Sequence, residues 1–175
     1  MDGIALFRAA SGDARELLEA TMADVTPEAG QWRPPGSVMP IAAQYAHVIY
    51  AMDATVHSLL QGKPALADST WLGRTGLSEL PPIRVLAPFN EWAAKAEIDL
   101  TALRGYAQAV YAEVDRVLGS LQDEDLQRKV DLNGAGLGEQ TALFVLTAGV
   151  LANVHLHCGE ISCLKGLQGQ RGYPV

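Results

Sequence analysis

Residues 140–166, QTALFVLTAGVLANVHLHCGEISCLKG, begin as an apolar helix and end as the most chemically loaded segment of the chain. In a helix, the side chains of Asn153, His157 and Glu160 stand at positions i, i+4 and i+7 and therefore lie on one face. His155 lies two residues before His157, about 200° away around the helix, so it belongs to a different face. The stretch predicts a helix with a metal or ligand site on one side.

Three further segments carry apolar residues at helical spacing, residues 4–22, 37–61 and 89–121. In the second of them we expect Ser37 as the N-cap and Pro40 in the first turn. The third segment has an unbroken 4-3-4-3 apolar spacing typical of a bundle seam, formed by Ala96, Leu100, Leu103, Ala107, Val110, Val114, Val117 and Leu121.

The connections complete the predicted architecture. Residues 62–88 form a long link rich in proline and glycine, which we expect Trp71 and Phe89 to fix in place. Residues 128–132 are extended in character but too few to predict a sheet. The sequence therefore predicts an all-α fold, a four-helix bundle of the up-and-down type with a long crossover loop, as a single domain over residues 1–175.

Composition narrows the classes of function. The chain has 175 residues, of which 49% are hydrophobic and 19% charged, and a net charge of −7 without a basic cluster. This disfavours binding to nucleic acid or to an anionic membrane. The longest apolar run, residues 142–152, is too short to span a bilayer, and the N-terminus lacks the apolar core of a signal peptide. Because two cysteines give no disulfide framework, we expect a cytoplasmic protein.

His47 and His157 are the candidate metal ligands, because each lies on an otherwise apolar predicted helix. Taken singly, either one is explained as a buried neutral histidine, but bundles build metal sites from side chains on facing helices. Zn, Ni or Fe would suit imidazole ligands, and a firm site needs about three protein ligands. Asn153, one turn before His157, offers only an amide oxygen. Glu160 offers a carboxylate, either as a ligand or as an acceptor for His157.

The remaining histidines and cysteines favour structural roles. We expect His57 near a helix end and His155 in a contact between helices. Cys158 has His155 at i−3 as its only cationic neighbour on the same face. This pair is a weaker hypothesis for a reactive thiolate that works without metal.

Two segments carry a resemblance to a known family. Residues 32–53, WRPPGSVMPIAAQYAHVIYAMD, and residues 157–169, HCGEISCLKGLQG, resemble the DinB-like (DinB/YfiT) proteins around their first metal histidine and in their last helix. The resemblance covers essentially the whole chain and implies a four-helix bundle, often dimeric. It also implies a divalent metal held by one histidine on the second helix and an H-x3-H pair on the fourth. His47 and His157 match the first and third ligands, and Asn153 stands where the second histidine belongs.

Two functions follow as hypotheses. The first is a metal-dependent enzyme with an incomplete triad of His47, Asn153 and His157, for which the resemblance implies a low-molecular-weight thiol cofactor and thiol transfer, isomerisation or hydrolysis. We expect Tyr50 and the loop of Trp71 to form the wall of its pocket, and we assign no catalytic residue. The alternative is a non-catalytic homodimer, a binding or scaffold bundle that has lost its metal site. The helix over residues 37–61, apolar on most sides, predicts burial within the bundle or by a second subunit.

Overall fold

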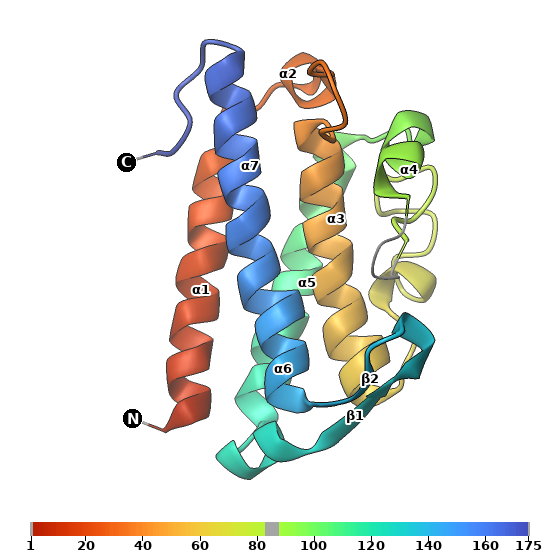
Figure 1. Ribbon diagram of the computed structural model, residues 1–175, viewed down its shortest axis with the longest axis vertical. Helices are drawn as coiled ribbons and strands as arrows, with labels where there is room; N and C mark the ends of the chain where they lie inside the picture. The colour runs from red at the N-terminus through yellow and green to blue at the C-terminus, as the bar shows by residue number, and fades with distance from the viewer. Residues whose placement is uncertain (1, 83–87, 175) are drawn as a thin grey trace.

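Four long helical segments form the bundle in the computed structural model, which describes residues 2–82 and 88–174 (Figure 1). They are α1 (Gly3–Met22), α3 (Ile41–Ala54), α5 (Leu100–Ser120) and the α6–α7 pair (Ala142–Leu146 and Asn153–Leu167). α1 packs on α7 and α5, and α3 packs on α5 and α7. The predicted all-α bundle is confirmed.

The long crossover makes α3 and α5 run in the same direction (Figure 1). It contains the short α4 (Phe89–Lys95), which lies outside the four main helices. Another short helix, α2 (Pro27–Gln31), joins α1 to α3, and Thr26 caps it by accepting a hydrogen bond from the amide of Ala29 at 3.2 Å. The crossover is fixed to the bundle where Trp71 packs on Tyr106, with ring centroids 5.9 Å apart.

Two helix boundaries differ from the prediction. α3 begins at Ile41, after Pro40 in the cap position, so Ser37 is not its N-cap. The helix predicted over residues 89–121 is broken, because Ala96 adopts an extended conformation and Asp99 caps a new helix. The Asp99 carboxylate accepts hydrogen bonds from the backbone amides of Thr101 and Ala102 at 2.8 and 3.1 Å.

A small antiparallel hairpin closes the end of the bundle before α6. β1 (Lys129–Leu132) pairs with β2 (Gly138–Thr141). The sequence predicts no sheet, because the short extended segment at residues 128–132 cannot form one alone. In the structure, β2 supplies the second strand. Val130 and Leu132 of β1 point into the core, whereas Lys129 and Asp131 are exposed. The hairpin therefore covers part of the hydrophobic core at this end of the bundle.

Both helices that carry the candidate histidines contain a π-helical turn. Thr55–Leu59 continues α3, and Thr147–Ala152 separates α6 from α7. The two segments meet at Gly149, where an added Cβ would lie 2.1 Å from Oγ1 of Thr55. π turns are rare and frequently occur at functional sites.

α3 is covered almost completely by the rest of this chain, since all its residues except His47 and Ala51 are buried. Its apolar character is therefore explained by the bundle itself. The segment Ala142–Leu167 is long and apolar enough to be a candidate membrane span by length and composition, although core helices of globular proteins meet the same criterion. It packs here against α1 and α3.

Candidate functional site

The fold brings His47 of α3 and His157 of α7 together. Their ring centroids are 4.9 Å apart, and the ring planes are inclined at 74°. Two imidazoles that bind one zinc ion at about 2.0 Å each would have centroids roughly 5 Å apart. The separation of His47 and His157 therefore suits two ligands of one ion.

Two acceptors beside one nitrogen of His157 determine which of its nitrogens carries a proton. Its Nδ1 lies 3.0 Å from Oε1 of Gln44 and 2.8 Å from Oε2 of Glu160. The amide of Gln44 is oriented by its own Nε2, which donates to the carbonyl oxygen of Met39 at 3.2 Å. Nδ1 of His157 therefore carries the proton and donates it, which leaves the lone pair on Nε2. Such a second hydrogen bond is the usual support of a metal-binding histidine.

Gln44 was not singled out in the sequence, although a signal was present. It is a polar residue three positions before His47, within an otherwise apolar helix, so both side chains share one face. Glu160 lies in one of its two expected places, as an acceptor for His157. Because it contacts Nδ1, it supports His157 from the side opposite the free Nε2.

His47 is half-buried between two aromatic rings. The ring of Phe89 meets it edge to face, with centroids 4.6 Å apart. The pKa of His47 is lowered from 6.5 to about 4, chiefly by burial and to a smaller extent by the nearby His157, while the amide of Asn153 acts in the opposite direction. His47 is therefore neutral at physiological pH and keeps a lone pair available.

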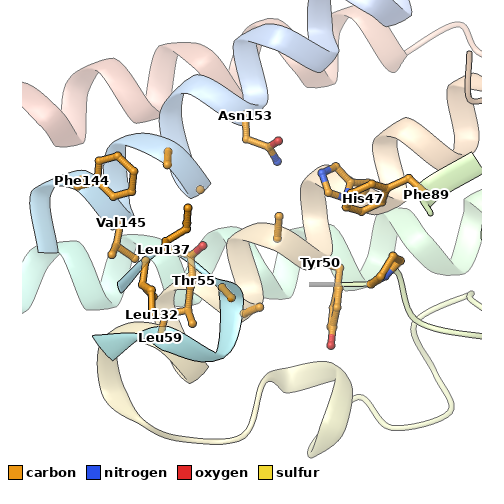
Figure 2. A pocket seen from close by; sticks show the side chains of 16 residues that line it. His47, Tyr50, Thr55, Leu59, Phe89, Leu132, Leu137, Phe144, Val145 and Asn153 are labelled. Atoms are coloured by element: carbon orange, nitrogen blue, oxygen red, sulfur yellow. The ribbon is translucent and has the colours of Figure 1, made fainter. Parts of the chain in front are cut away.

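Asn153, the first residue of α7, lies beside His47, and its amide points into the space next to that ring (Figure 2). Its buried Nδ2 has no hydrogen-bond partner within the described residues. Asn153 is therefore the residue of this cluster with the least defined role, because its nitrogen is unpartnered and its oxygen is a weak metal ligand. The three residues that the sequence singled out thus lie together.

A cavity of about 350 Å³ extends from this cluster toward the hairpin (Figure 2). Its walls come from α3 and its π turn, α6 with the following π turn, the hairpin and the start of α4. The lining residues are His47, Tyr50, Ala51, Ala54, Thr55, Leu59, Pro82, Phe89, Leu132, Ala135, Leu137, Phe144, Val145, Ala148, Gly149 and Asn153. The hairpin and the π turns, which the sequence did not predict, therefore supply seven of the sixteen lining residues.

Both predicted wall elements reach the cavity, since Tyr50 and Pro82, the latter from the loop of Trp71, are lining residues. The hydroxyl of Tyr50 points away from His47 (Figure 2). Burial, together with the charges of Asp68 and Asp53, raises the pKa of Tyr50 to about 12, so its phenol stays protonated. Trp71 itself packs on Tyr106 and is not among the lining residues.

The metal-free thiolate hypothesis is wrong. Cys158 is buried, and its Sγ lies 3.5 Å from Oγ1 of Thr21. Burial raises the pKa of the Cys158 thiol, which is the opposite of activation. His155 is exposed, and its Nδ1 lies 3.1 Å from the carbonyl oxygen of Leu151.

Within residues 2–82 and 88–174, no three His, Cys, Asp or Glu side chains are grouped to hold a metal ion. A divalent ion at this cluster would have two imidazole ligands and the amide oxygen of Asn153 as the third. His47 and His157 fit such an ion by their spacing, His47 also by its neutrality and His157 by the hydrogen bonds that hold its Nδ1. The donor set is weaker than three imidazoles, so the fit predicts modest affinity.

Comparison with known proteins shows the family to which the chain belongs. No curated protein matches the chain. A crystal structure of a conserved protein from Enterococcus faecalis has a similar fold, with a TM-score of 0.80 at 20% sequence identity, over 97% of this chain and 99% of that one. Residues 12–161 match the DinB superfamily, as the resemblance of the two motif segments predicted. The chain therefore belongs to the DinB superfamily.

Proposed function

We propose that this protein is a metal-dependent enzyme that binds one divalent ion, Zn, Ni or Fe, through His47, His157 and the amide oxygen of Asn153. The observation that carries the proposal is the pair of imidazoles 4.9 Å apart, one of which, His47, lines a cavity of about 350 Å³. A bound ion would act as a Lewis acid that activates a thiol or a water molecule, so thiol transfer or hydrolysis is the reaction class.

The chain's own residues prepare the site in three ways. Gln44 and Glu160 hold the ring of His157 and keep its proton on Nδ1. Burial keeps His47 neutral, and the cavity beside its ring offers apolar walls to a small substrate. The low-molecular-weight thiol remains part of the proposal, as the cofactor that the family resemblance brings.

Metal analysis of untagged protein, purified without chelators or metal columns, tests the proposal. We expect about one divalent ion per chain after incubation with Zn or Ni, lost in His47→Ala and His157→Ala with the helical circular dichroism unchanged. His155→Ala is the matched control, because that exposed histidine of the same helix points elsewhere and should leave metal binding unchanged.

A second variant examines the weak ligand directly. Asn153→His replaces the amide with a third imidazole at the same helical position, so we expect the affinity for Zn to rise about tenfold or more. Unchanged affinity would mean that position 153 does not face the ion.

The second candidate is a non-catalytic binding or scaffold protein. What favours it is the lack of a three-residue His, Cys, Asp or Glu group within the described residues. It predicts no bound metal even with excess Zn or Ni, and only a modest change in stability on His47→Ala. That outcome would overturn the first proposal.

A further inference from the structure

We infer that the cavity takes a neutral, mainly apolar small molecule whose single hydrogen-bonding oxygen faces His47 and Asn153. The inference concerns the same site and therefore rests on the proposed function, but it names the class of compound that enters. It is drawn from the walls of the cavity, their charge and the polar groups at one end.

The walls far from the histidines are apolar. Leu59 belongs to the π turn after α3, Leu132 and Leu137 come from the hairpin, and Phe144 and Val145 come from α6. Leu137 and Phe144 are 37% and 43% exposed, so large apolar side chains form the rim as well as the interior. A surface of this kind favours burial of hydrocarbon groups.

The described part of these walls carries no charged side chain. Among the described residues that line the cavity, none is Asp, Glu, Lys or Arg. An ionised ligand would lose its hydration there without gaining a counter-charge, and a compound with many hydroxyl groups would leave several of them unpaired. The protein's net charge of −7 further disfavours an anion. The body of the ligand is therefore uncharged and poor in polar groups.

The polar end of the cavity, at His47 and Asn153, can form hydrogen bonds with one oxygen atom of a ligand. The amide Nδ2 of Asn153 lacks an acceptor among the described residues, and the imidazole of His47 lines the same end of the cavity. A carbonyl or hydroxyl oxygen would supply the missing acceptor. The compound therefore has a hydrocarbon body and one polar functional group, such as a ketone, an aldehyde or an alcohol.

A homologous series tests the inference. Binding of 2-butanone through 2-nonanone would be measured by saturation-transfer NMR and calorimetry, in EDTA and again with Zn. We expect affinity to rise about fourfold for each added methylene until the cavity is filled, with or without the ion. Heptanoate and glucose should bind at least about tenfold more weakly than 2-heptanone.

Two exposed leucines provide a matched pair of variants. Leu137→Asp puts a charge in the cavity wall and should weaken 2-heptanone binding about tenfold or more. Leu72→Asp changes a leucine that is 70% exposed and outside the cavity, so binding should stay unchanged. Equal binding of the ketone by both variants would overturn the inference.

The outcomes separate this inference from the proposed function. Chain-length dependence without any metal binding would leave the inference standing and remove the metal-dependent enzyme. Metal binding without chain-length dependence, or with heptanoate or glucose bound as tightly as 2-heptanone, would remove the inference and leave the metal-dependent enzyme standing.

Discussion

Asp53 has no exposed surface, yet its carboxylate is fully surrounded by donors. It accepts hydrogen bonds from the backbone amides of Leu66 and Ala67 at 2.9 and 3.0 Å and from the hydroxyl of Tyr106. Nδ1 of His57 lies 2.7 Å from its Oδ1. One buried residue thus joins α3, α5 and the beginning of the crossover, and His57 belongs to this structural network, not to the metal cluster.

Asp53→Asn should destabilise the protein by about 3–5 kcal/mol, because an amide cannot accept from all these donors and its NH2 group would face some of them. Urea unfolding followed by circular dichroism measures the loss. Glu139→Gln is the control with the same chemical change: Glu139 and its partner Lys129 are both 61% exposed and 3.5 Å apart, so we expect a change below about 1 kcal/mol. A loss in Asp53→Asn no larger than in this control would contradict the role given to Asp53.

His47 predicts a pH dependence for the metal-free protein. Its pKa is about 4 when folded and about 6.5 when unfolded, so the unfolded chain binds the proton more readily. Stability is therefore fully present above about pH 6.5 and is lost as the pH falls toward 4, by roughly 3 kcal/mol in all. In EDTA, an NMR titration should give a midpoint near 4 for the ring of His47. His47→Gln should unfold with a smaller loss of stability between pH 6.5 and 4.5, and a midpoint near 6.5 would contradict burial as the cause.

At the scale of elements, the two π turns determine the shape of the cavity. Thr55–Leu59 and Thr147–Ala152 both contribute lining residues, and they touch where Gly149 meets Thr55. A π turn adds a residue to one turn of helix, so it changes which side chains face inward beyond it. The spacing of Asn153 and His157 is unaffected, because both lie after the turn in regular α7.

Gly149→Ala should destabilise the protein by about 1–3 kcal/mol, since the new methyl group would overlap Oγ1 of Thr55 at 2.1 Å. Thermal unfolding measures this. The added change Thr55→Ala should recover part of the loss by removing that hydroxyl. Gly12→Ala in α1, where nothing lies within 4 Å of the new Cβ, should instead stabilise by about 0.5–1 kcal/mol. A neutral Gly149→Ala would mean that the two turns can separate without cost.

At the scale of the whole molecule, the long apolar segment Ala142–Leu167 is poorly covered. Within Ala142–Leu167, only 33% of the most apolar 18-residue window is buried. Leu156 and Leu167 on α7 are 68% and 65% exposed, and Leu6 on the neighbouring α1 is 61% exposed. We propose that a second chain covers the exposed apolar side chains of α7, because contiguous apolar surface marks interaction sites. The homodimer that we expected from the apolar α3 therefore remains a proposal, now with α7 as its surface.

Light scattering after size exclusion should give twice the chain mass of 18.7 kDa. Leu156→Glu places a charge in the proposed interface and should yield a monomer with unchanged helix content. Leu72→Glu, equally exposed but in the crossover, should remain dimeric. A wild-type mass of one chain at all accessible concentrations would overturn the dimer.

The sequence by itself determined the class of fold and three members of the cluster. Apolar spacing and the family motifs predicted the helical bundle and the cluster of His47, Asn153 and His157, and helical periodicity, which is local, placed Asn153 and His157 on one face. The sequence could not show the break at Ala96, where the apolar seam continues in register although the helix ends.

Only the tertiary structure decided how the site is built. Gln44 reaches His157 across 113 positions of the chain, and the hairpin and both π turns become walls only once the helices pack. The neutrality of His47 is likewise a result of burial. Periodicity reports which side of a helix is covered, but the identity of the covering groups is a property of long-range packing, which no local pattern encodes.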